Sequence, residues 1–293
     1  MKTRKIYNSL MNILIILILF FTTQSYLLFS NFIYSTTFVI NYFDNTEIIK
    51  NGFGFHPYTL EINKFNGGLF YYGSFHNVNL KHPQFVDIEK KWNKFKPDLA
   101  YCEGHNWPLI KVRNSAIRKC GEQGLLRYLA YRDKVKIKSI EPSKRMELRY
   151  ILKHYPAAKV KIYYVLRQLI INKEIFRKNI NSNSYIRGLL RNISKCIYFN
   201  NLIMTIAEFN WNIKRLLPDL KDWRKIDSKY FMNIRRPNNW LAKINVLVNK
   251  YRDKYMVKKI LEELRKGKKI FALVGKSHVV NQEDILLKKI NIL

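Results

Sequence analysis

The sequence predicts an α/β fold with a central, mainly parallel sheet that is flanked by helices. Apolar runs of strand length alternate with segments of helical spacing in the first half of the chain. Two of these runs, 69–72 and 270–274, each lead into the pattern Gly-x-x-His, in which the glycine is expected to end the strand with a sharp turn. Residues 143–249 carry helical spacing and no convincing strand, which predicts a helical insertion between the two halves that carry the motif.

The chain starts with a segment that is typical of protein export. Three basic residues lie within the first five positions, and residues 6–43 carry no charge. Residues 23–25 offer a cleavage site for a signal peptide, whereas an uncut helix would be long enough to span a bilayer. We therefore expect residues 1–43 to be a signal peptide or a membrane anchor, and the protein to be exported, as a membrane-anchored, periplasmic or extracellular protein. A buried core helix is the alternative.

We expect residues 44–293 to form one domain, whose elements follow from local patterns. Residues 44–66 are mixed in composition and predict an entry loop with a short strand. Bounded apolar runs predict further strands at 67–72, 99–102, 135–140 and 269–274. Helical spacing predicts helices at 85–95, 116–131, 145–154, 158–171, 202–217, 240–266 and 283–289. Gly267 stands where a helix C-terminus favours glycine.

The composition limits the classes of partner. A formal charge of +32 would suit nucleic acid or an anionic membrane surface. The basic residues are not clustered, however, and no RRM, zinc-finger or helix-turn-helix motif accompanies them, so nucleic-acid binding is not expected. Attraction to a membrane surface stays open. The three cysteines form no CxxC pair and are expected to be buried free thiols.

Ionisable side chains follow four of the expected strands at their carboxyl ends, where open α/β sheets place their ligand crevice. They are His76, Glu103, Glu141 and His278. Two histidines and a carboxylate suit general acid and base catalysis on water. The same three residues, His76, Glu103 and His278, would alternatively hold a divalent metal ion with open positions for water and substrate. Taken alone, each histidine is better explained as a loop histidine, and each glutamate is equally well explained as a helix-capping or ion-paired carboxylate.

Several familiar catalytic signatures are missing from the sequence. There is no Gly-x-Ser-x-Gly pattern, which disfavours a serine hydrolase of the fold that uses this elbow. There is also no P-loop and no dinucleotide-binding fingerprint.

Six short motifs occur in a particular order along the chain. They are Tyr72-Gly-Ser-Phe-His76, Asp98-Leu-Ala-Tyr-Cys-Glu103-Gly, Gly121-Glu-Gln-Gly124, Glu141-Pro142, Arg252-Asp253 with Met256, and Val274-Gly-Lys-Ser-His278. In this order they resemble the TraB/Tiki-like and erythromycin-esterase-like superfamily. The resemblance extends from Gly67 to the carboxyl end and implies an α/β fold with a Gly-x-x-His in each half. Relatives in that superfamily include erythromycin esterases and Tiki proteins, which act as hydrolases, the latter as metal-dependent proteases of the membrane surface.

The resemblance also implies roles for single residues. His76, Glu103 and His278 would form the core of the site, and Arg252 would supply a positive charge for an oxyanion or for holding a carboxylate.

Supporting positions follow from the same motifs. Glu122 and Glu141 match acidic motif positions, and Asp253 would pair with the neighbouring arginine or cap its helix locally. Lys276 departs from the small residue that is common inside the second motif. Its charge is expected to lower the pKa of His278.

We therefore expect a hydrolase of ester or peptide bonds that acts on a small-molecule or peptide substrate and is exported or held at a membrane by its N-terminal segment. It would work with or without a divalent metal ion. A non-catalytic ligand-binding or signalling protein that retains the fold is one alternative, and a basic membrane-surface protein is another.

Overall fold

A computed structural model describes residues 57–64, 67–105, 107–175, 179–194, 198–199, 204–231 and 239–292. All of these residues belong to one compact unit, Thr37–Leu293. The expected export segment, residues 1–43, lies outside the described residues. Across the described part of the chain, no helix is both long and apolar enough to cross a membrane.

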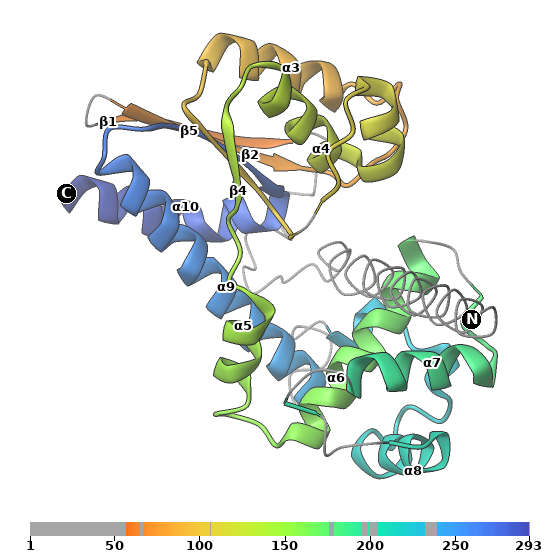
Figure 1. The fold of residues 1–293 in the computed structure, drawn as a ribbon. Coiled ribbons are helices and arrows are strands. Elements are labelled where there is room, and N and C mark those ends of the chain that lie inside the picture. Colours follow the sequence, from red (N-terminus) through yellow and green to blue (C-terminus); the bar gives the residue numbers. More distant parts are fainter. Residues whose placement is uncertain are drawn as a thin grey trace, which may run out of the picture. The chain divides into compact units, whose positions relative to one another are not determined.

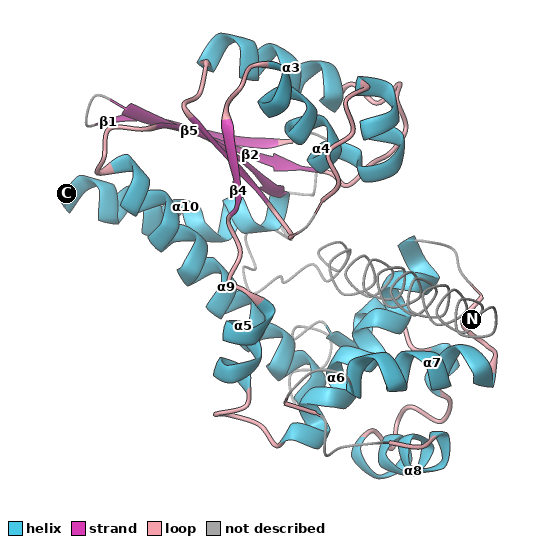
Figure 2. Cartoon of the chain, in the orientation of Figure 1, coloured by secondary structure: helices cyan, strands magenta, loops and turns pink. Residues whose placement is uncertain are grey.

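Five strands form one mixed sheet in the order β1-β2-β5-β3-β4 (Figures 1 and 2). They are β1 Tyr58–Lys64, β2 Gly67–Ser74, β3 Leu99–Cys102, β4 Lys136–Ser139 and β5 Lys269–Gly275. The edge strand β1 pairs antiparallel with β2, whereas β2, β5, β3 and β4 are parallel to one another. The prediction of a mainly parallel sheet flanked by helices is therefore confirmed.

The position of each strand follows from its residues. β5 lies in the middle and is buried from its second residue to its end, as expected for a continuous apolar run in a parallel sheet. β4 lies at an edge, where its lysines are partly exposed and discourage pairing with another chain. The first residue of β2 is Gly67. Only glycine fits there, because a Cβ would come within 2.6 Å of the backbone of Gly267 and Lys268.

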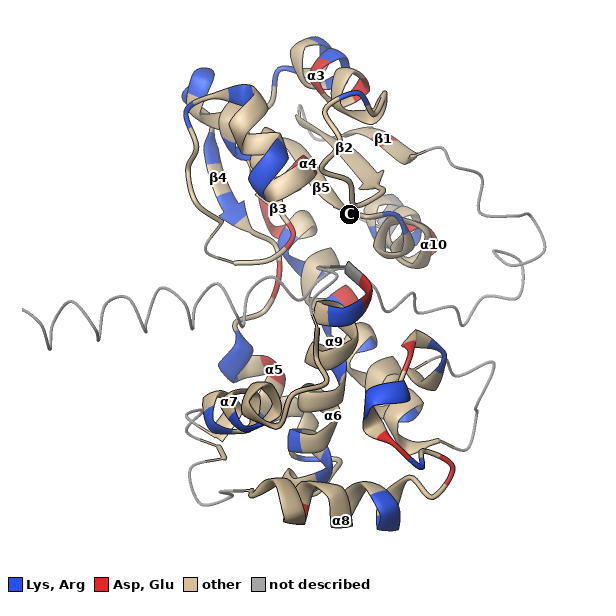
Figure 3. Ribbon diagram, turned by 90° about the vertical axis from the view of Figure 1, so that its right-hand side faces the viewer, with Lys and Arg blue, Asp and Glu red and all other residues tan. Residues whose placement is uncertain are grey.

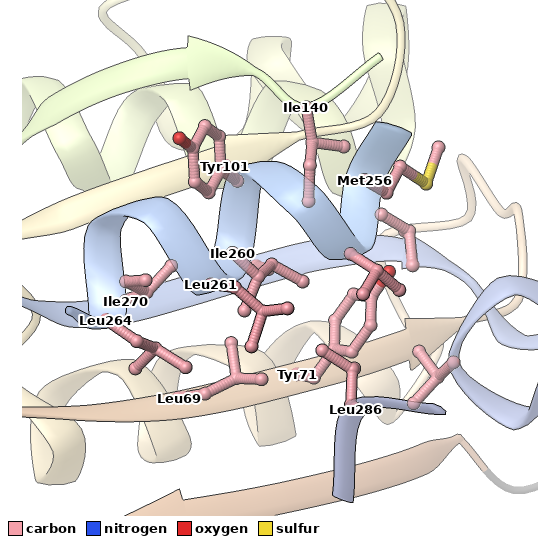
Figure 4. Packing of buried hydrophobic residues seen from close by; sticks show 14 of the residues in the cluster. Leu69, Tyr71, Tyr101, Ile140, Met256, Ile260, Leu261, Leu264, Ile270 and Leu286 are labelled. Carbon is pink, nitrogen blue, oxygen red and sulfur yellow. The ribbon is translucent and has the colours of Figure 1, made fainter. Parts of the chain in front are cut away.

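Helices cover both faces of the sheet. On one face lie α9 Trp240–Leu264 and α10 Lys276–Ile292, and on the other lie α3 Gln84–Phe95 and α4 Arg113–Arg132. Figure 4 shows α9 directing Ile260 and Leu261 at the face that carries Tyr71 and Ile270. On the opposite face Phe271 stacks on Phe70 with ring centroids 5.2 Å apart. Burial of each such side chain stabilises the fold by roughly 1.5–3 kcal/mol.

The described elements between β4 and β5 are all helical, as predicted for residues 143–249. They are α5 Lys144–Ile151, α6 Ala157–Ile170, a π-helical turn Ile171–Ile175, α7 Asn183–Ser194, α8 Ile206–Leu216, 3-10 turns at Trp223–Lys225 and Ser228–Phe231, and α9. Local caps define several starts: Ser143 caps α5, Thr205 forms a capping box with Glu208 on α8, and Asn239 caps α9.

The two motif glycines do not end their strands in the way that the sequence suggested. β2 continues through Gly73 to Ser74, β5 includes Gly275, and α10 begins at once with Lys276 rather than at residue 283. Neither glycine has the left-handed φ of a turn residue. A Cβ on Gly73 would lie 2.8 Å from the Cα of Lys276, so this glycine serves close approach between the two motifs.

Two other local predictions have clear outcomes. Gly267, just beyond α9, has φ +69, and its N–H donates to the carbonyl of Leu264, as expected at a helix C-terminus. Cys102 and Cys120 are free and buried, as expected, while Cys196 lies outside the described residues.

Candidate functional site

The strand order brings the sequence-predicted residues to one edge of the sheet. His76, His278, Glu103 and Glu141 follow β2, β5, β3 and β4, which are neighbours in that order. The Nε2 of His278 lies 3.4 Å from Oε1 of Glu103. A Cβ on Gly275 would stand 3.2 Å from Nε2 of His76 and 3.5 Å from Oε2 of Glu103. Both histidines therefore lie beside one glutamate. The space between His76 and Glu103 is open because Gly275 has no side chain.

Glu103 is the central group of this cluster and is almost completely buried. Its Oε1 accepts a hydrogen bond of 3.0 Å from Arg252, and its Oε2 accepts one of 2.6 Å from the backbone N–H of Gly275. Burial raises the pKa of Glu103, but the charges of His278 and Arg252 outweigh it and hold the pKa at about 2. Glu103 is therefore ionised at neutral pH.

Arg252 joins two of the strand-end carboxylates. The same nitrogen, Nη2, that donates to Glu103 also donates to Oε1 of Glu141, whose Oε2 accepts from the backbone N–H of Gly104. Burial would lower the pKa of Arg252, but the neighbouring carboxylates, Glu141 foremost, raise it above its usual value. Of the two roles that the resemblance implies for Arg252, the geometry fits the holding of carboxylates.

His278 stands in the first turn of α10 and pairs with Asp253 of α9. The Nδ1 of His278 lies 2.6 Å from Oδ1 of Asp253, which also accepts a 2.7 Å hydrogen bond from Gln282. Asp253 therefore binds this histidine rather than Arg252. Burial lowers the pKa of His278, but Asp253 and then Glu103 outweigh it and raise the pKa to about 9.

The pKa of His278 is raised overall by Asp253 and Glu103, so any lowering by the charge of Lys276 does not decide its protonation, and that contribution stays a prediction. The Nζ of Lys276 lies 5.3 Å from the ring centroid of Phe75, the residue before His76 in the first motif. Burial lowers the pKa of Lys276 itself.

His76 pairs with a different carboxylate, Glu122 of α4. The Nδ1 of His76 lies 2.6 Å from Oε1 of Glu122, whose side chain is completely buried. The backbone of α4 departs from helical geometry at Gly121, with φ 58 and ψ −140. A Cβ at Gly121 would stand 2.7 Å from the carbonyl oxygen of Asn77, so glycine is needed where α4 meets the first motif.

Two polar residues near the site were not anticipated from the sequence. The side chain of Gln84 accepts from the N–H of Phe75 and donates to its carbonyl, at 3.1 and 2.6 Å, which fixes the loop that carries His76. Glu147 of α5 accepts from Lys144 at 2.6 Å and from Tyr164 at 2.5 Å. Glu147 had a signal in the sequence, as the lone acidic residue in the basic stretch 142–173. Gln84 had none.

The residues match a proton-transfer site better than a metal site. Each histidine has its Nδ1 on a carboxylate, as metal-ligating histidines often do. However, Glu103 is already neutralised by Arg252, and the Nε2 of His278 carries a proton below about pH 9. Among the described residues, no group of three His, Cys, Asp or Glu side chains is arranged to hold a metal ion. A metal at His76, Glu103 and His278 stays a prediction from the sequence.

The charges of the described residues separate into two patterns. Lysines and arginines are spread over the helices and over β4 (Figure 3). Buried carboxylates gather instead at the strand ends, as Glu103 and Glu122 do. The chemistry of the molecule is therefore concentrated at the carboxyl edge of the sheet.

No family model, no curated protein and no solved structure matches the chain. The resemblance to the TraB/Tiki-like and erythromycin-esterase-like superfamily rests on the six motifs and stays a prediction. What the site can do is therefore argued from its own geometry.

Proposed function

We propose that this protein is a hydrolase of ester or peptide bonds, exported or held at a membrane by residues 1–43, with His76 as general base and His278 as general acid. One observation supports this assignment most strongly. Two histidines beside the same glutamate have different carboxylate partners and different exposure, and such differences separate acid from base in many active sites.

His76 has the environment of a general base. The Nδ1 of His76 lies 2.6 Å from Oε1 of Glu122. In the proposed mechanism this nitrogen donates its hydrogen to the carboxylate, which leaves the lone pair on Nε2. The His76 side chain is 18% exposed, so a water molecule can reach it. In the proposed reaction Nε2 removes a proton from water while the water oxygen bonds to the carbonyl carbon of the substrate. The π electron pair of the C=O bond moves onto the carbonyl oxygen and re-forms that bond when the leaving group departs.

His278 has the environment of a general acid. Its pKa of about 9 keeps the imidazole protonated at neutral pH, and Glu103 and Asp253 stabilise that cation. As the bond from the carbonyl carbon to the leaving oxygen or nitrogen breaks, Nε2 of His278 donates its proton to the leaving atom. Proton exchange with solvent then restores both histidines.

A substrate screen with matched variants tests the proposal. We expect the full-length protein to hydrolyse at least one member of a panel of chromogenic esters and fluorogenic peptides. His76→Ala and His278→Ala should each lower kcat by about 10²-fold or more while circular dichroism shows that the fold is retained, and His154→Ala, at an exposed position, serves as the control. The rate should fall as pH rises through about 9, because His278 loses its proton there. Turnover at the unaltered level in both variants would contradict the assignment.

A further inference from the structure

A buried arginine on α6 lacks the partner that such a charge normally has. Arg167 is 7% exposed. Within the described residues its Nε has no hydrogen-bond acceptor, and the guanidinium forms no ion pair. Arginine stays charged in proteins, and buried charges are normally paired with an acceptor of opposite charge. An unpaired buried group of this kind calls for a ligand or a role in function.

Asn249 on α9 also has a buried donor without an acceptor among the described residues. It is 4% exposed, and its Oδ1 accepts a 3.4 Å hydrogen bond from Nη1 of Arg252. Its Nδ2 finds no acceptor within the described part of the chain. The unmatched atoms of Arg167 and Asn249 are all donors, so the missing group is an acceptor. A carboxylate matches the planar fork of a guanidinium and accepts from an amide as well.

A contact between α6 and α9 lies one helical turn before each of the two residues. The hydroxyl of Tyr163 donates to Oδ1 of Asn245 at 2.9 Å and thereby fixes α6 against α9. Arg167 lies four residues after Tyr163, and Asn249 lies four residues after Asn245, so each occupies the next turn of the same helix face.

The electrostatics of Lys144 support this placement. Burial lowers the pKa of the Lys144 amino group, and the charges of Arg167 and Arg252 lower it further against the opposing effect of Glu147. Arg167 therefore lies near enough to act on the same group as Arg252. Asn249 is joined to the site directly, since Arg252 bonds both Asn249 and Glu103.

We propose that Arg167 and Asn249 form a subsite that binds a carboxylate group of the substrate hydrolysed at His76 and His278. This inference rests on the proposed function and specifies its substrate class, an ester or peptide that carries a free carboxylate away from the scissile bond. Arg167 would donate two parallel hydrogen bonds to the carboxylate, and the Nδ2 of Asn249 would donate a third.

Paired substrates test the subsite through catalysis. The charged substrate is the 4-nitrophenyl monoester of glutarate, which has a free carboxylate. The neutral substrate is the methyl ester of the same compound, which has none. Arg167→Gln should lower kcat/KM for the charged substrate by about 10- to 100-fold and change that for the neutral one by no more than about twofold. Arg187→Gln, an exposed arginine on α7, is the matched control. An equal effect of R167Q on both substrates would overturn the proposal.

Glutarate binding tests the subsite without catalysis. Glutarate should raise the melting temperature of the unaltered protein and of His76→Ala, and leave that of Arg167→Gln unchanged. If no ester is hydrolysed but this pattern holds, the subsite stands and the hydrolase proposal fails. If esters are hydrolysed but glutarate binds no less well to R167Q, the subsite is wrong and the hydrolase stands.

Without ligand, R167Q should melt no lower than the unaltered protein. A clear decrease would assign Arg167 a structural role and overturn the proposal.

Discussion

Replacing Asp253 by asparagine tests the ionic environment of His278 without any substrate. The two side chains are 2.6 Å apart, and the His278 side chain is 9% exposed. The substitution removes the charge that contributes most to raising the pKa of His278 and leaves the burial that lowers it. We therefore expect the pKa to fall from about 9 to near or below its ordinary value of 6.5.

The size of the effect on stability follows from linkage. Because the folded-state pKa lies above the unfolded one, the protonated imidazole stabilises the fold fully below pH 6.5, and this stability is lost as the pH rises through about 9. The difference between 6.5 and about 9 corresponds to roughly 3 kcal/mol. Asp253→Asn should therefore lower the free energy of unfolding by about this amount near pH 6, and by much less near pH 10.

Two measurements check this prediction. Urea unfolding followed by circular dichroism gives the free energy of unfolding at several pH values, and an NMR titration of the histidine ring protons gives the pKa directly. Asp284→Asn, an exposed carboxylate on the same helix as His278, is the control and should show no such pH-dependent difference. A pKa of His278 that stays near 9 in D253N, or a loss of stability that is the same at low and high pH, would refute the reasoning.

Three further predictions concern the space and the chemistry around the histidines. Gly275→Ala would place a methyl group 3.2 Å from Nε2 of His76, so kcat/KM should fall at least about tenfold with little change in melting temperature. Gly73→Ala would place its Cβ 2.8 Å from the Cα of Lys276, and urea unfolding should show a loss of about 1–3 kcal/mol. Dialysis against EDTA should leave the rate of hydrolysis unchanged, because His278 holds a proton where a metal would bind; activity that is lost and then restored by zinc would contradict this.

The strands were predictable because their apolar runs have clear borders. Leu99–Cys102 forms β3 with the predicted bounds, since Pro97 and Asp98 precede the run and Glu103 ends it. The convergence of the ionisable residues was also predictable, because parallel strands share one carboxyl edge. Helix α7 was missed although its buried residues Ile186, Leu189 and Leu190 have helical spacing, because Gly188 and several Asn and Ser residues lower its helix propensity.

The order of the strands and the purpose of the glycines could not be read from the sequence. β5 is the last strand in the chain but lies between β2 and β3, a long-range pairing that no local pattern encodes. Whether a glycine provides a turn or a close approach depends on the neighbouring segment. At Gly73 that neighbour is Lys276, about 200 residues away.

The repeated Gly-x-x-His does not imply that the two histidines are equivalent. In the ladder between β2 and β5, Gly73 pairs with Val274 and not with Gly275, so the two motifs are offset by one residue. The first histidine is carried by a loop and the second by the first turn of a helix. Each consequently meets a carboxylate from a different helix, and the carboxylates around the second keep it protonated at neutral pH. The repeat therefore sets where the two side chains lie, and the elements packed around them set what each one can do.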